Sequence, residues 1–192
     1  MVVKFPILKQ ENNRKNVLRV LRTVVIAALS VIVCFLLQGS VFSALSFSGI
    51  TPNLLLVVTA SFGLLLGDVR GMAVGVCCGL LGDIFFGPLL GFQTLLYALI
   101  GFGCGKFERS FFVDELRLPI LLIVACDFLY GFVSYVFLFL VRGRFFFSYF
   151  LWHRILPEMV YTLLAAAALY PLLLFLYNRF MKKRREDEAN GV

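Results

Sequence analysis

Three carboxylates lie within or at the edge of apolar segments, and they are the first candidates for chemistry: Asp83, Asp127 and Glu158. An aspartate at the centre of a membrane helix costs roughly 2.5–3.5 kcal/mol on insertion scales, so such residues usually pair or serve a proton or ion pathway. Two interpretations stay open, a relay and a structural role in which the acids pair or Asp127 is kept neutral by burial. We favour the structural role, because no Lys or Arg lies opposite Asp127 within a span.

The other reactive side chains form no catalytic or metal-binding motif. The five cysteines all fall in apolar runs, none in a C-x-x-C pair, and His153 is the single histidine. A zinc site needs four Cys or His ligands at short spacings. Neither an H-E-x-x-H motif nor a nucleophile elbow occurs. We therefore expect no enzyme activity, metal or cofactor.

The composition is that of a membrane protein. Of 192 residues, 61% are hydrophobic and 15% are charged, whereas soluble domains have about 45–50% and about 25%. The net charge of +7 does not indicate nucleic-acid binding, which needs a solvated basic face. We expect an all-α integral membrane protein instead, in contact with the lipid bilayer.

Apolar runs of helical length predict six transmembrane helices. A basic tail at 1–22 precedes the membrane domain, 23–178, and a charged tail at 179–192 follows it. Pro171 should kink the last helix. The second, third and fourth spans are short, so some should be tilted little or should pack inside the bundle without facing lipid. The expected spans are about 23–47, 52–66, 71–86, 91–105, 118–141 and 155–177.

The distribution of positive charge predicts the orientation. With six spans, fifteen of the eighteen Lys and Arg residues fall on the side of the two termini, which the positive-inside rule makes cytoplasmic. The outer side holds Arg142, Arg144 and Arg154, which are candidate partners for Asp83 and Glu158. The aromatic loop 145–152 on that side is interpreted as an interfacial anchor, with a docking surface as the alternative.

Glycines recur every fourth residue in the third expected span. Gly71, Gly75 and Gly79 would lie on one face of a helix, and small residues at this spacing let two backbones approach closely. Packing within the bundle is the favoured interpretation. The alternative is a groove that receives the helix of another protein.

Together these residues resemble the MreD family of rod shape-determining membrane proteins, over about residues 20–180. The resemblance rests on order and spacing, and Asn53 stands where the family often has an aspartate. Leu156-Pro157 at the start of the last span is also similar. The matching motifs are Thr51-Pro52-Asn53 before three leucines, Gly71-x3-Gly75-x3-Gly79, Asp83, Gly91 and Tyr97-x3-Gly101.

The resemblance implies a non-enzymatic scaffold of the bacterial cell-elongation complex, in the cytoplasmic membrane, that binds an MreC-type single-span partner and helps control peptidoglycan synthesis. It also implies a fold similar to the substrate-binding subunits of energy-coupling-factor vitamin transporters. A small-molecule-binding transporter subunit is therefore the alternative function, with Asn53, Asp83, Gln93, Trp152 and Glu158 as candidate ligand contacts. The scaffold hypothesis favours Pro52, Asn53, Gly71, Gly75, Gly79, Asp83 and Gly91 as packing or partner-binding residues.

Overall fold

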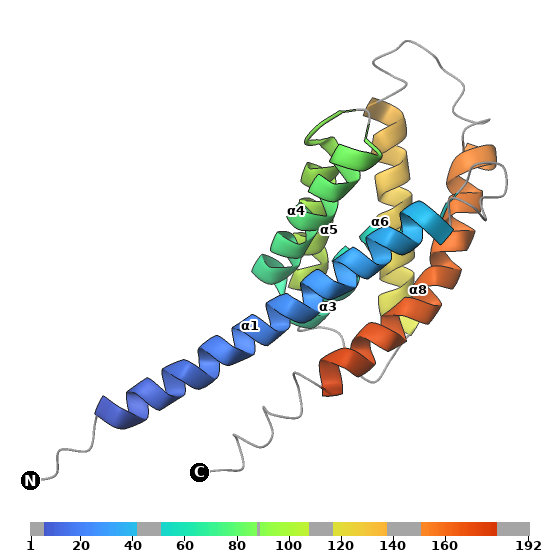
Figure 1. Cartoon of the computed structure of the whole chain (residues 1–192). Helices are drawn as coiled ribbons and strands as arrows, with labels where there is room; N and C mark the ends of the chain where they lie inside the picture. The colour runs from blue at the N-terminus through green and yellow to red at the C-terminus, as the bar shows by residue number, and fades with distance from the viewer. Residues whose placement is uncertain (1–5, 42–50, 88, 108–116, 138–150, 180–192) are drawn as a thin grey trace, which may run out of the picture.

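The computed structural model describes residues 6–41, 51–87, 89–107, 117–137 and 151–179. This part of the chain forms a bundle of α-helices with two short turns of π-helix, η1 (Leu37–Val41) and η3 (Leu151–Ile155) (Figure 1). The α-helices are α1 (Pro6–Leu36), α3 (Leu54–Leu66), α4 (Asp68–Phe85), α5 (Phe92–Lys106), α6 (Arg117–Tyr135) and α8 (Leu156–Tyr177).

These six helices match the six predicted segments, with one clear difference at the first. α1 begins at Pro6, within the stretch expected to be a tail, because proline suits the first turn of a helix and nothing after it breaks the helix. Its membrane-compatible part is Val20–Ser40, close to the expected start at residue 23. Two other helices are also long and apolar enough to cross a membrane, α6 and α8. Pro171 lies inside α8, which continues on both sides of it.

The shortest of the helices, α3, forms the centre of the bundle. All residues from Leu54 to Leu65 are buried, and α3 packs against α1, α4, α5, α6 and α8. Its 13 residues extend about 20 Å, less than the roughly 30 Å of a hydrocarbon core. A helix enclosed by protein does not need to span that distance, because its ends can hydrogen-bond to neighbouring side chains.

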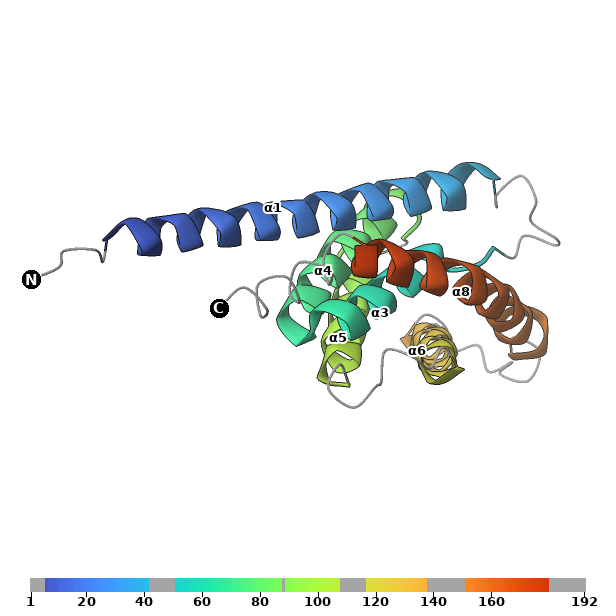
Figure 2. The ribbon, with the colours of Figure 1, turned by 90° about the horizontal axis from the view of Figure 1, so that it is seen from below.

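The remaining helices surround α3. Seen from below, α1 runs along one edge of the bundle and α6 lies at the opposite edge (Figure 2). The tightest pair is α4 and α5, which form a hairpin. Aromatic contacts join the ends of the helices away from the termini. Phe35 of α1 lies 5.0 Å from Phe85, and Phe92 of α5 stacks on Phe137 at 4.8 Å, between ring centroids.

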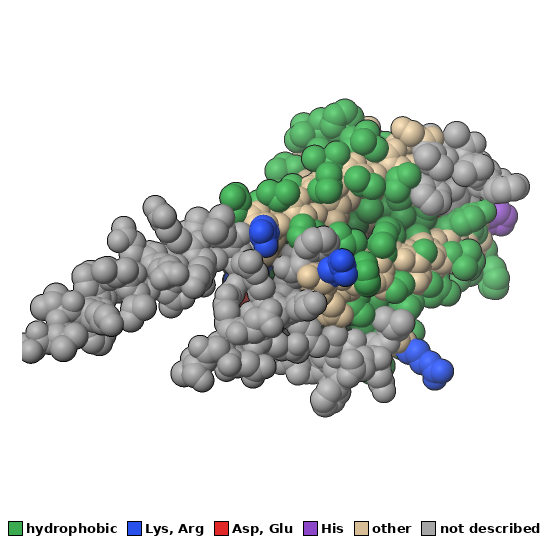
Figure 3. Space-filling model, turned by 60° about the horizontal axis from the view of Figure 1, so that its bottom comes forward, with side chains coloured by type: hydrophobic (Ala, Val, Ile, Leu, Met, Phe, Trp, Pro, Cys, Tyr) green, Lys and Arg blue, Asp and Glu red, His purple; other side chains and the backbone are tan. Residues whose placement is uncertain are grey.

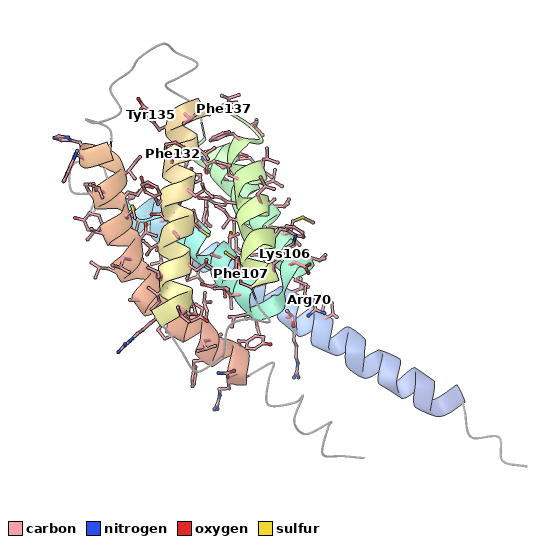
Figure 4. The ribbon with its side chains drawn as sticks, turned by 180° about the vertical axis from the view of Figure 1, so that it is seen from behind. Arg70, Lys106, Phe107, Phe132, Tyr135 and Phe137 are labelled. Atoms are coloured by element: carbon pink, nitrogen blue, oxygen red, sulfur yellow. The ribbon has the colours of Figure 1, made fainter. Side chains whose placement is uncertain are left out.

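Basic side chains gather at the end of the bundle from which both termini leave. Arg70 and Lys106 lie at this end, whereas Phe132, Tyr135 and Phe137 lie at the other (Figure 4). Arg117 begins α6 at the same end. On the face shown in Figure 3, the side chains of the described residues between the ends are mostly hydrophobic. Among the described residues, Arg70, Lys106 and Arg117 therefore lie at the end that the positive charges predict to be cytoplasmic, and the orientation itself stays a prediction.

Candidate functional site

The glycine face of α4 packs directly on the backbone of α5. A Cβ atom at Gly71 would lie 2.6 Å from the carbonyl oxygen of Gly101, and one at Gly75 would lie 2.7 Å from the carbonyl carbon of Tyr97. A Cβ at Gly79 would lie 2.7 Å from the nitrogen of Thr94. Side chains other than hydrogen therefore cannot fit without moving α5, and at Gly71 also α3, because Gly63 lies against the same position. The three glycines thus set an antiparallel register between the two helices.

Asp83, near the end of α4, caps the beginning of α5. The residue as a whole is only 3% exposed. The backbone N–H groups of Gly91, Gln93 and Thr94 donate to its carboxylate at 2.9–3.0 Å, and the hydroxyl of Thr94 donates at 2.6 Å. The first N–H groups of a helix lack partners within that helix and favour a negative charge. Asp83 thus fixes the turn between α4 and α5.

The glycine at this turn allows that geometry. Gly91 adopts a φ of 94°, in the left-handed region that side chains disfavour. This conformation aims the amide of Gly91 and those that follow it at one carboxylate. The predicted candidates Asp83 and Gly91 therefore belong to one structural unit.

A second polar cluster joins α3, α5 and α8 inside the bundle. Asn53 is buried, and its side-chain oxygen accepts hydrogen bonds from the amide of Leu56 at 3.2 Å and from the hydroxyl of Tyr97 at 2.7 Å. The backbone N–H of Asn53 donates to the hydroxyl of Thr162 at 3.3 Å. Asn53 therefore caps α3 and ties it to two neighbouring helices, while Pro52 is buried beside it.

Asp127 of α6 extends this cluster to a fourth helix. Its carboxyl interacts with Thr162 and is 3% exposed. The other carboxyl oxygen, Oδ1, has no hydrogen-bond partner among the described residues. Tyr130, one turn further along α6, packs its ring 5.5 Å from that of Tyr97. Asn53, Tyr97, Thr162 and Asp127, which we call the interhelical polar cluster, thus connect α3, α5, α8 and α6.

Two of the remaining predicted residues interact with these units: Gln93 donates its backbone N–H to Asp83, and Glu158 interacts electrostatically with Tyr97. Glu158, in the first turn of α8, is partly buried. Trp152 is 66% exposed, and the side chain of Gln93 lies against Gly82. Arg142, Arg144 and most of the aromatic loop 145–152 fall outside the described residues, and nothing is described of the Arg154 side chain. A ligand site formed by Asn53, Asp83, Gln93, Trp152 and Glu158 therefore stays a prediction.

The described cysteines are all free thiols. Cys104 of α5 and Cys126 of α6 approach most closely, with 3.6 Å between their sulfur atoms. Within the described ranges, no three His, Cys, Asp or Glu side chains gather in a way that could hold a metal ion.

Sequence reasoning did not select Gln38, Tyr97 or Thr162 as polar contacts. Gln38 accepts a hydrogen bond from the amide of Leu55 at 3.2 Å, next to the cap that Asn53 provides. Each of these three residues is an isolated polar side chain in an apolar helix, a pattern that does not reveal its partner. Their distance along the chain from Asn53 and Leu55 explains why no local spacing indicated them.

Comparison with protein families gives one decisive match. Residues 18–180 match the family described as MreD, the rod shape-determining protein. The chain belongs to the MreD family. The matched region contains the α4–α5 hairpin, the Asp83 cap and the interhelical polar cluster. The family assigns this member a role in rod-shape determination and places it among membrane proteins.

No curated protein and no solved structure matches this chain. The similarity to vitamin-transporter subunits therefore stays a prediction.

Proposed function

We propose that this MreD-family protein is a non-enzymatic scaffold of the bacterial cell-elongation complex. It resides in the cytoplasmic membrane with both termini in the cytoplasm, binds an MreC-type single-span protein, and so helps control where peptidoglycan is made. The observation that carries the proposal is the family match over residues 18–180.

The contacts of the polar residues are consistent with a scaffold. Asp83 and Asn53 both accept hydrogen bonds from their own chain, which fixes the helices relative to one another. A scaffold needs such fixed geometry, because a partner helix recognises a surface of constant shape.

The surface open to a partner is the apolar exterior, since α5 covers the glycine face of α4. Helices in membranes associate through close packing of such exteriors. Exposed apolar residues occur on every outer helix, including Leu29 of α1, Ile84 of α4, Leu129 of α6 and Leu164 of α8. Each samples a different face of the bundle.

Photo-crosslinking at these four positions tests partner binding. We expect one face to crosslink to the MreC-type protein in living cells, with the other three serving as internal controls. Normal amounts of membrane-inserted protein without a crosslink from any face would contradict the proposal.

Replacing acids by their amides tests the absence of chemistry. Because a scaffold needs shape and not proton transfer, cells that depend on Asp127→Asn together with Glu158→Gln should remain rod-shaped. Rounded cells with wild-type levels of the variant would instead favour a relay or an enzyme.

A further inference from the structure

An apolar groove of about 410 Å³ separates α1 from the ends of three other helices. Residues along one face of α1, from Val20 to Ile32, form one wall. The opposite wall comes from the end of α3 and the beginning of α4. Representative lining residues are Val24, Ala28, Leu65, Val74 and Cys77.

Polar groups occur at one end of this groove. Arg70, in the first turn of α4, is the single charged residue of the lining, which contains no carboxylate. Tyr177, the last residue of α8, and Thr23, near the start of the membrane-compatible part of α1, also line it. Arg70 lies at the same end of the bundle as Lys106 (Figure 4). The groove thus has one cationic mouth and an apolar body.

The length of the groove fits one leaflet of a bilayer. The stretch of α1 from Val20 to Ile32 rises about 18 Å, and half of a hydrocarbon core is about 15 Å. A groove of this length and of about 410 Å³ suits a narrow, flexible chain that lies along α1.

We propose that the groove binds an anionic glycerophospholipid of the cytoplasmic leaflet. One acyl chain lies between α1 and α4, and the lipid phosphate contacts Arg70. The leaflet follows from the orientation in the proposed function, whereas the binding chemistry does not depend on it. Anionic headgroups are favoured over zwitterionic ones because the charged residue among the described lining residues, Arg70, is positive.

Native mass spectrometry of the purified full-length chain tests this site. The chain is delipidated in detergent and titrated with palmitoyl-oleoyl phosphatidylglycerol or with phosphatidylcholine of the same acyl chains. We expect one tightly held phosphatidylglycerol per chain. A cationic side chain near a membrane surface is worth about 1 kcal/mol, which corresponds to about fivefold in affinity. Phosphatidylcholine should therefore bind about fivefold more weakly.

Two variants with matched controls separate charge from shape. Arg70→Gln should lower phosphatidylglycerol affinity about fivefold, whereas Arg117→Gln, a change of an exposed arginine at the same end, should not. Ala73→Phe should fill the groove and abolish retention of both lipids, whereas Leu164→Phe on exposed α8 should not. If Ala73→Phe lowers the thermal midpoint without lipid, Ala28→Phe fills the groove from α1 instead.

Several outcomes would overturn the lipid site. For the wild-type chain, these outcomes are that no lipid is retained or that the two lipids bind with equal affinity. For the variants, they are that Arg70→Gln and Arg117→Gln change lipid affinity equally, or that Ala73→Phe and Leu164→Phe change lipid retention equally. Ala73→Phe is also placed in the photo-crosslinking experiment, where loss of the crosslink to the MreC-type protein together with unchanged lipid binding would assign the groove to that partner. The lipid titration itself contains no partner, so its failure would leave the scaffold proposal standing.

Discussion

The hydroxyl of Thr94 donates a 2.6 Å hydrogen bond to the carboxylate of Asp83, which also accepts the amide of Thr94. One residue of α5 thus holds the end of α4 through two donors. The same Thr94 backbone contacts Gly79. The Asp83 cap and the register between α4 and α5 at Gly79 therefore depend on each other. A shift of either helix would break both contacts.

Removing the cap should destabilise the fold. Asp83→Ala leaves three backbone amides and one hydroxyl without their acceptor, and loss of a helix cap costs about 0.5–2 kcal/mol. We expect a loss at the upper end, about 2 kcal/mol, in thermal or denaturant unfolding in detergent. Asp68→Asn is the control, because Asp68 is exposed and accepts one amide, that of Val69. Equal stability of the Asp83→Ala and Asp68→Asn variants would refute the capping role.

Adding a methyl group to the glycine face should separate α4 from α5. In Gly75→Ala the new Cβ would lie 2.7 Å from the carbonyl carbon of Tyr97, and overpacking typically costs about 1–3 kcal/mol. Gly103→Ala in α5 meets nothing within 4 Å and should be neutral or stabilising by about 0.5–1 kcal/mol. Unfolding measurements on the two variants test this difference. The same unfolding midpoint for Gly75→Ala and Gly103→Ala would argue against the observed packing.

The interhelical polar cluster should show energetic coupling. Tyr97→Phe removes the donor to Asn53, and hydrogen bonds between membrane helices contribute about 0.6 kcal/mol on average. A double-mutant cycle of Tyr97→Phe and Asn53→Leu should give a coupling of about that size or larger. In the control cycle, Tyr161→Phe is combined with Asn53→Leu in place of Tyr97→Phe. A coupling of zero for both cycles would mean that the Tyr97–Asn53 contact is absent in the membrane.

Cysteine labelling should reveal the orientation. In a chain without its native cysteines, Trp152→Cys should react with a membrane-impermeant maleimide in intact cells. Asp68→Cys, at the opposite end, should react only after the membrane is opened. The reverse labelling pattern would show that the orientation is opposite to the one inferred from the positive charges.

Sequence patterns predicted the helices well and the contacts between them poorly. Hydropathy located all six segments, because burial in lipid imposes long apolar runs. The helix α1 begins at Pro6, ahead of the expected membrane span, since the polar residues after Pro6 are compatible with a helix outside the hydrocarbon. The contacts of Asp83 with Thr94 and of Asn53 with Thr162 were not predicted, because they depend on helix packing. The four-residue glycine spacing did indicate close approach, without naming α5 as the neighbour.

The direct backbone contact between α4 and α5 limits how the protein can move. Helices separated by long side chains can slide as those side chains change rotamer, but here the carbonyl of Gly101 fits against Gly71 with no intervening atoms. The α4–α5 hairpin is therefore expected to move as one rigid body. A force applied where α4 turns into α5 would tilt both helices together and displace Arg70 and Lys106 at the far end by a comparable amount.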